Sequence, residues 1–286
     1  MAELIMITFT TTILIDGLQF PEGPRWHDGR LWFSDMNAQK VMTVDLAGNL
    51  QTIVQVPGSP SGLGWLPDGR LLVVSMAERS LLRFENGKLE QVADLSDLAT
   101  FHCNDMVVDE CGRAYVGNFG FDLGSFRELV PAEIIMVGPG GEAVKVAGDL
   151  LFPNGTVITP DGKTLIVAET FGQRLTAFDI RPDGMLTNRR VWAEMKGYYP
   201  DGICLDEAGG IWVASPENHA GVLRVLKGGH ISHRVSVESN AYACMLGNHD
   251  RKTLFVLTAG ASTPRKIEAG GRIEIVEVET PGAGLP

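Results

Sequence analysis

Hydrophobic and polar positions along the chain follow one pattern that recurs six times. Each copy has a hydrophobic stretch, a turn containing Asp and usually Gly, and then a short run of β-prone residues. The turn residues are Asp28, Asp68, Asp109, Asp161, Asp206 and Asp250. Their separations are 40, 41, 52, 45 and 44 residues. A period of this length indicates a repeat architecture.

A second hairpin follows most of these units, as in 40–54 and 80–93. Its turns contain Asn-Gly, Gly-Gly or Asp-Gly, which supply the positive φ angles that tight hairpins need. No long helix is predicted, and Pro131 interrupts the weakly helical stretch 126–134. Four short strands in each of six repeats predict an all-β fold, a six-bladed β-propeller with four strands per blade. We expect residues 1–286 to form this one domain.

The sixth repeat is one strand short. After the strand predicted at 253–258, only one further strand, 271–279, precedes the tail of the chain. The segment 9–17 near the N-terminus has strand character and would supply the missing strand. Pairing the first and last segments would close the ring and remove exposed sheet edges.

Polar residues occupy one repeat position directly upstream of several turns. Pro-x-Gly recurs in three repeats with Glu22, Asn154 and Asp201 in the middle, and the third repeat has Asn104 there. The first strand of a propeller blade lies nearest the axis, so these side chains should converge. One such residue alone would be an ordinary polar strand end. Two carboxylates and two amides together would repel or stay unsatisfied without a counter-ion, which predicts a bound divalent cation.

The predicted ligands are all hard oxygen donors, with no Cys or His among them. This donor set favours Ca²⁺, Mg²⁺ or Mn²⁺, with Ca²⁺ as the first expectation. Ligand identity also leaves Zn²⁺ and Fe²⁺ open. Positions filled by water would remain on the ion, as in a catalytic site.

The segments PEGP, CNDM, FPNG and PDGICLD resemble the senescence marker protein / gluconolactonase / luciferin-regenerating enzyme family across essentially the whole chain. The resemblance implies a six-bladed propeller with one divalent metal and, in many members, hydrolysis of sugar lactones. It implies that Glu22, Asn154 and Asp201 are metal ligands. Asn104 would contact substrate and, in some relatives, the metal. Asp201 would also be the general base, and Asp122 would be an acidic substrate contact.

The chain departs from this family pattern at one position near the site. Relatives often have Arg where this chain has His102, and His cannot make the bidentate contact of a guanidinium. We predict a substrate contact for His102, with a structural role as the alternative. The long segment 118–131 brings Phe119, Phe121 and Phe126 and would cover the mouth, with Phe121 at the substrate. These rings either pack between blades or line a pocket for a less hydroxylated lactone or ester.

The predicted chemistry is opening of a lactone ring. A cation would polarise the carbonyl and lower the pKa of bound water. Asp201 would act either as a base or as a covalent nucleophile. No GxSxG or phosphate-binding loop occurs. The alternatives are a propeller esterase or phosphotriesterase-like hydrolase, similar to diisopropyl-fluorophosphatase, and a non-catalytic binding module.

The composition of the chain limits the classes of partner and the cellular location that we expect. The net charge is −11, without a basic run, which argues against nucleic acid. The four Cys form no CxxC motif, and no apolar stretch reaches the ~20 residues of a membrane span. We therefore expect a cytoplasmic protein whose partner is a small lactone or ester. The 34 Gly match the many hairpin turns of the repeat.

Overall fold

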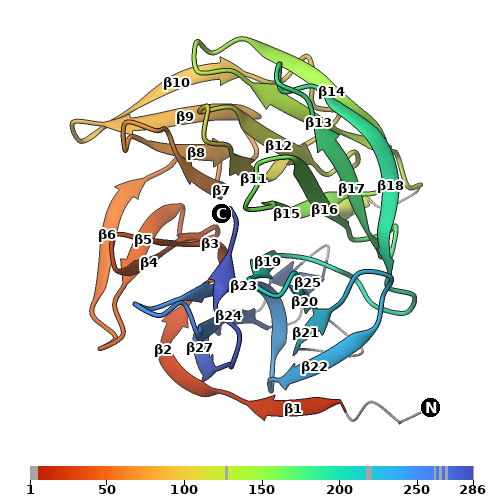
Figure 1. The fold of residues 1–286 in the computed structure, drawn as a ribbon. Helices are drawn as coiled ribbons and strands as arrows, with labels where there is room; N and C mark the ends of the chain where they lie inside the picture. Colours follow the sequence, from red (N-terminus) through yellow and green to blue (C-terminus); the bar gives the residue numbers. More distant parts are fainter. Residues whose placement is uncertain are drawn as a thin grey trace.

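Six small sheets of mainly antiparallel strands are arranged radially around one axis (Figure 1). The computed structural model describes residues 6–125, 128–216, 221–260, 262–263, 266–267 and 270–285. The predicted six-bladed β-propeller is confirmed. Within the described ranges, helix is limited to the short 3₁₀ segment η1 (Leu123–Ser125), and no helix there is long and apolar enough to cross a membrane.

The first four blades each contain four consecutive strands, with the first strand innermost. Blade 1 comprises β3 (Pro21–His27), β4 (Arg30–Asp35), β5 (Lys40–Val44) and β6 (Leu50–Gln55). Blade 2 comprises β7 (Pro60–Trp65), β8 (Leu71–Ser75), β9 (Ser80–Glu85) and β10 (Lys88–Asp94). Blade 3 comprises β11 (Cys103–Val108), β12 (Ala114–Asn118), β13 (Ala132–Val137) and β14 (Ala143–Leu150). Blade 4 comprises β15 (Pro153–Ile158), β16 (Thr164–Glu169), β17 (Arg174–Ile180) and β18 (Leu186–Glu194).

The last two blades also use strands from the two ends of the chain. Blade 5 comprises β19 (Ile203–Asp206), β20 (Ile211–Ser215), β21 (Gly221–Val225) and β22 (Ile231–Ser236). Blade 6 comprises β23 (Asn240–Gly247), β24 (Thr253–Ala259), β27 (Gly271–Glu277) and β2 (Thr12–Leu18). A small hairpin, β25 (Ser262–Thr263) and β26 (Lys266–Ile267), falls between β24 and β27 in sequence.

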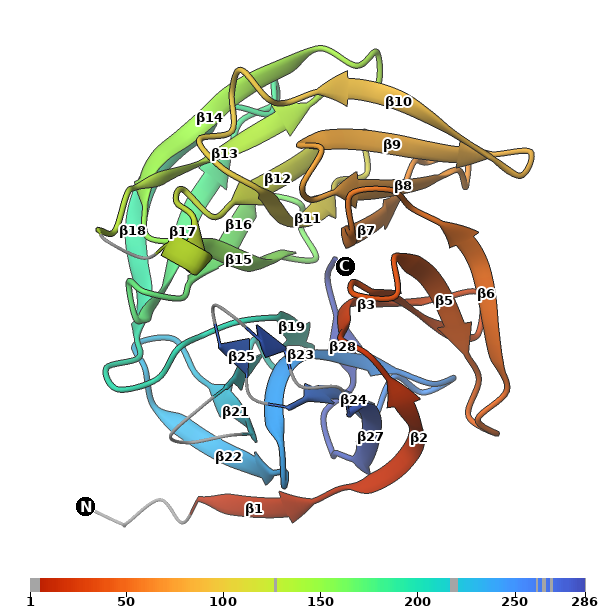
Figure 2. The same ribbon diagram turned by 180° about the vertical axis from the view of Figure 1, so that it is seen from behind.

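The N-terminal strand closes the ring as predicted. β2 pairs with β27 in antiparallel register, with Thr12 opposite Ile275. The preceding strand β1 (Ile7–Thr10) was not expected as a separate element. It lies parallel to β22 and adds a fifth strand to the outside of blade 5 (Figure 2). The N-terminal segment therefore joins the outer edges of two neighbouring blades.

The C-terminal tail lies near the axis at the opposite end from the predicted ligands. β28 (Gly282–Ala283) pairs with the end of β19, and Leu285 bridges Ile158 at the end of β15. Asn154 lies at the start of β15, and Asp201 precedes β19. The tail therefore contacts the far ends of the inner strands.

The glycines of the Pro-x-Gly motif are explained by crowding of the inner strands. A Cβ on Gly155 would lie 2.5 Å from the amide nitrogen of Ile203 in the next blade. A Cβ on Gly23 would lie 2.7 Å from the carbonyl oxygen of Ser61. Only a residue without a side chain lets adjacent blades approach this closely, so the motif is first of all a packing requirement.

Candidate active site

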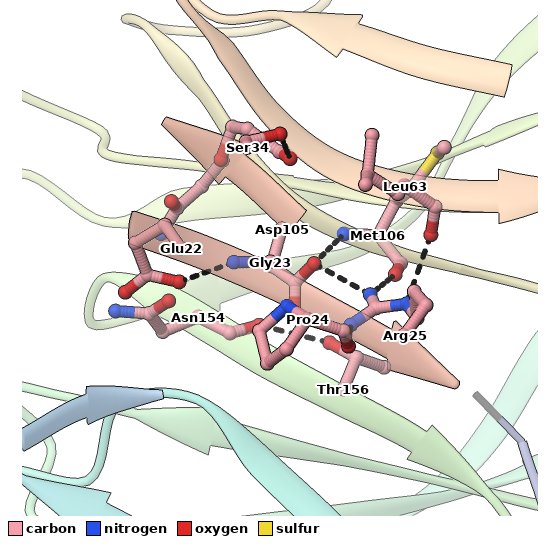
Figure 3. A network of polar contacts seen from close by, with 12 residues as sticks. Glu22, Gly23, Pro24, Arg25, Ser34, Leu63, Asp105, Met106, Asn154 and Thr156 are labelled. Carbon is pink, nitrogen blue, oxygen red and sulfur yellow. Dashed lines mark hydrogen bonds and ion pairs between the residues drawn. The ribbon is translucent and has the colours of Figure 1, made fainter. Parts of the chain in front are cut away.

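One cavity of about 200 Å³ is lined by all four predicted ligands. Glu22, Asn104 and Asn154 are each the second residue of an inner strand, β3, β11 and β15. Asp201 stands two residues before β19. Figure 3 shows the Glu22 carboxylate and the Asn154 amide turned toward each other. Side chains from four blades are thus brought to one place.

A register irregularity recurs where the ligand side chains leave their strands. The pairing of β3 with β4 shifts between Glu22 and Arg25, and that of β15 with β16 shifts between Pro153 and Thr156. The same shift occurs in blade 3 after Cys103. Such bulges re-aim a side chain relative to a regular strand. The irregularity therefore re-aims the strand at Glu22, Asn104 and Asn154, while Asp201 precedes its strand.

The two carboxyl groups of the cavity are hard to ionise together. Burial raises the pKa of Glu22 well above its usual value, and the charge of Asp201 raises it further. Burial also raises the pKa of Asp201, with a further contribution from the charge of Asp105. A bound cation would remove this conflict, because it favours the charged form of both groups.

The two amides are oriented by their nitrogen atoms. Asn104 Nδ2 donates to the carbonyl oxygen of Pro153 at 3.2 Å, and Asn154 Nδ2 donates to Thr170 Oγ1 at 3.3 Å. Thr170 Oγ1 in turn donates to the carbonyl oxygen of Pro200, next to Asp201. These bonds hold the nitrogen end of each amide against the protein, which suits the oxygen end to a cation.

The donor set therefore fits a divalent cation through mixed ligands. In the part of the chain that is described, no group of three or more His, Cys, Asp or Glu side chains is placed to hold a metal ion. The cavity instead has two carboxylates and two amides. Two negative charges and hard oxygen atoms are what Ca²⁺ and similar ions require.

A buried ion pair lies in the channel wall beside this site. Asp105 stands where most repeats have the Gly of Pro-x-Gly, and its Oδ1 accepts a 2.7 Å hydrogen bond from Arg25 Nη2 (Figure 3). Arg25 also donates to the carbonyl oxygens of Leu63 and Met106. Its guanidinium therefore bonds to the inner strands of blades 2 and 3.

His102 and Phe121 do not line the cavity. His102 stacks on Phe101, with ring centroids 4.2 Å apart, and burial lowers its pKa, which favours the neutral ring. Phe121 is buried and packs against Phe152, 6.0 Å away between centroids. Their predicted substrate contacts stay predictions, and Phe126 lies outside the described residues.

Asp122 is exposed and bonds within its own loop. Its carboxylate accepts hydrogen bonds from the amide of Gly124 and the hydroxyl of Ser125, which lowers its pKa. These bonds stabilise η1. Asp122 is not among the residues lining the cavity, and its predicted contact with substrate stays a prediction.

Phe119, expected from the sequence at the mouth, does line the cavity, whereas several other lining residues, Met36, Met76 and Phe20 among them, were not singled out from the sequence. Met36 and Met76 line the cavity, as does Phe119, and each directly follows the second strand of its blade. This common repeat position is a signal that could have identified them. Phe20 and Phe152 both stand two residues before a predicted ligand, and both line the cavity.

Fold and site together define a six-bladed propeller with an oxygen-donor cavity near its axis. The sequence model of the SMP-30/Gluconolactonase/LRE-like region matches residues 20–260. The chain belongs to this family.

Individual relatives have low sequence identity to this chain, but the matches cover large parts of both chains. The chain is 24% identical to 6-deoxy-6-sulfogluconolactonase of Pseudomonas putida, over 93% of each chain. It is 27% identical to diisopropyl-fluorophosphatase of Loligo vulgaris, over 62% of this chain and 63% of that protein. The crystal structure of regucalcin from Agrobacterium tumefaciens, described as a calcium-binding protein, superposes with a TM-score of 0.79 at 21% identity, covering 97% and 99% of the two chains.

Proposed function

We propose that the protein is a metal-dependent lactone hydrolase with a divalent cation held by Glu22, Asn104, Asn154 and Asp201. The observation that carries the proposal is the meeting of these four oxygen donors in one cavity. Family membership and a relative named as a sugar lactonase support the reaction class. The choice of Ca²⁺ rests on the donor set.

Each residue of the proposed site would have its own role in the reaction. A cation bound here would polarise the lactone carbonyl and lower the pKa of water. Asp201 accepts the proton of the attacking water or holds that water in place; burial raises its pKa, while hydrogen bonding from Asn154 and Gly202 opposes that effect and a bound cation would favour the ionised form. Asn104 is held by Pro153 and presents its amide to the substrate. The apolar side chains around them exclude bulk water.

A second candidate is hydrolysis of a phosphotriester or related phosphorus ester. The relative from Loligo vulgaris carries a name of this class and shares part of the chain. The same four donors would serve, because a phosphoryl oxygen also accumulates charge as it is attacked.

Metal analysis combined with a substrate panel tests the proposal. Protein purified without chelator is expected to hold about one divalent ion per chain and to open lactones faster than phosphotriesters. Chelation should abolish turnover, and readdition of Ca²⁺ should restore it. A metal-free protein inactive on every lactone would overturn the proposal, and faster turnover of phosphotriesters would select the second candidate.

A further inference from the structure

Apart from the four proposed ligands, the cavity has mainly apolar walls. On one side Phe20 and Tyr242 lie 4.6 Å apart between ring centroids, with Met36 packed against them. On the other side Phe119 is stacked on Phe152 at 4.5 Å and an interplanar angle of 28°. These walls come from blades on opposite sides of the axis, so a substrate at the ligands would be held between aromatic surfaces.

Two further apolar side chains complete the lining. Met76 follows β8 of blade 2, and Leu123 comes from η1 in the long segment after β12. The long segment therefore takes part in the cavity through Leu123 and Phe119.

Polar groups that could bind substrate hydroxyls are few. Among the described lining residues, the polar side chains beyond the four ligands are the amide of Asn37 and the phenol of Tyr242. The phenol donates to the carbonyl oxygen of Gly260 at 3.3 Å. No Arg, Lys or His lines the described part of the cavity.

This lining has an energetic consequence for a sugar lactone. Each hydroxyl buried without a partner loses its hydrogen bonds to water and disfavours binding. An alkyl or aryl group in the same place is removed from water and favours binding with each buried CH₂. The difference accumulates over the several hydroxyls of a sugar ring and favours an apolar substrate.

At least one aromatic wall of the cavity is held in place before any ligand binds. Phe152 is buried and held at a φ of 63°, and it packs edge-on against Phe171 at 5.3 Å. A left-handed backbone angle at a bulky residue persists only where the surroundings determine it. The ring of Phe152 is therefore a preformed surface rather than a side chain that turns aside for a polar ligand.

From these observations, and resting on the lactonase function proposed above, we infer that the substrate is a lactone carrying alkyl or aryl substituents rather than a polyhydroxylated sugar lactone. Water adds to the acyl carbon and the ring C–O bond breaks. The ring oxygen takes up a proton, and the product is an apolar hydroxy acid. Met76 and Phe119 are the side chains expected to set this preference.

The test compares kcat/KM for 3,4-dihydrocoumarin, δ-nonalactone and glucono-1,5-lactone on the metal-loaded protein. We expect the two apolar lactones to be preferred by about a hundredfold or more, because a hydrophobic pocket discriminates by about a hundredfold against one added hydroxyl. Met76→Ser should reduce that preference by about tenfold. Met185→Ser, at a half-buried methionine outside the cavity, is the matched control and should leave the preference unchanged.

Binding gives a second readout that does not need turnover. In calorimetric titrations of the wild-type protein, 3,4-dihydro-2-quinolinone, the lactam analogue of dihydrocoumarin, should bind with a lower Kd than gluconolactam. This measurement does not depend on whether Met76→Ser folds. A higher kcat/KM for gluconolactone, or a lower Kd for gluconolactam, would overturn the inference and leave the lactonase function standing. Hydrolysis of no lactone in the panel would overturn both.

Discussion

Arg25 and Asp105 form an ion pair at 2.7 Å inside the channel wall, with 4% and 9% of their side-chain surfaces exposed. Arg25 belongs to blade 1 and Asp105 to blade 3. Between them, the guanidinium also donates a hydrogen bond to the carbonyl oxygen of Leu63 in blade 2. Besides burial and Asp201, the charge of Asp105 raises the pKa of Glu22, while Arg25 lowers it. The pair therefore connects three blades and balances charge next to the proposed metal site.

Replacing one partner of this pair should be more harmful than replacing both. Arg25→Met leaves Asp105 buried without its cation, close to two other carboxyl groups, and should cost about 3–5 kcal/mol of unfolding free energy. The double variant Arg25→Met with Asp105→Leu should recover a large part of that loss. Urea denaturation of the metal-free proteins measures both. Single losses that simply add in the double variant would contradict the coupling.

The glycine at the end of the Pro-x-Gly motif should tolerate no side chain in blade 4. Gly155→Ala places a methyl group 2.5 Å from the amide nitrogen of Ile203 and 2.6 Å from the carbonyl oxygen of Asp201. The clash is with backbone, so we expect a loss of about 3 kcal/mol, at the upper end for overpacked interiors. Gly148→Ala is the control, because its Cβ would meet no atom within 4 Å. Equal thermal midpoints for the two variants would refute the argument.

The repeat allowed the fold and the ligand positions to be predicted from sequence, because both follow from spacing. Glu22 and Asp201 stand at equivalent places in their blades, so convergence on the axis needed no knowledge of side-chain packing. The partner of Asp105 could not be predicted. Arg25 lies 80 residues away, and its reach across blade 2 depends on how closely the inner strands approach. Asp122 also shows this limit, because it lies between β12 and β13 in a segment longer than its counterparts in the other blades, so the repeat spacing could not place its side chain.

Loss of the proposed metal should follow from a change at Glu22 but not from one at the matching position of blade 2. Glu22→Gln removes one of two negative charges in the cavity and should lower metal affinity by at least about tenfold. Ser61 occupies the equivalent repeat position, is buried and does not line the cavity, so Ser61→Ala should keep normal metal content. Atomic absorption after dialysis measures both. Unchanged metal content in Glu22→Gln would remove Glu22 from the ligand set.

Asp201→Asn should separate catalysis from folding. The substitution keeps the size of the side chain but removes the base and one ligand charge. We expect an unchanged melting temperature for the metal-free protein and a loss of most turnover at saturating metal, about a hundredfold or more for a catalytic base. Turnover close to that of the wild type would exclude Asp201 from the mechanism.

Glu169 should make the stability of blade 4 depend on pH. Burial raises the pKa of this carboxyl, but hydrogen bonds from Arg174, Thr176 and the amide of Leu151 outweigh that effect and lower the pKa below the usual value of a glutamate. A carboxyl with a depressed folded-state pKa stabilises the protein above its unfolded pKa and loses that contribution as pH falls through the folded value. Glu169→Gln should thus cost about 2 kcal/mol at pH 7.

The pH series of this variant carries the decisive comparison. The gap between wild type and Glu169→Gln should narrow as pH falls from the usual pKa of a glutamate through the depressed folded-state pKa, because the wild-type carboxyl then becomes neutral as well. Chemical denaturation from pH 7 to pH 3 follows it. A gap of constant size would show that the charge of Glu169 contributes nothing to stability.

Two N-terminal truncations should distinguish the role of β2, which closes the ring, from that of β1, which only adds an outer strand to blade 5. Removing residues 1–16 deletes most of β2 and leaves β27 of blade 6 without its outer partner, so we expect cooperative unfolding to be lost. Removing residues 1–10 deletes β1, which adds only a fifth strand to blade 5, and should lower the melting temperature by a few degrees while keeping one sharp transition. Differential scanning calorimetry distinguishes the two outcomes. A 1–16 deletion that melts like the full chain would show that the ring does not need β2.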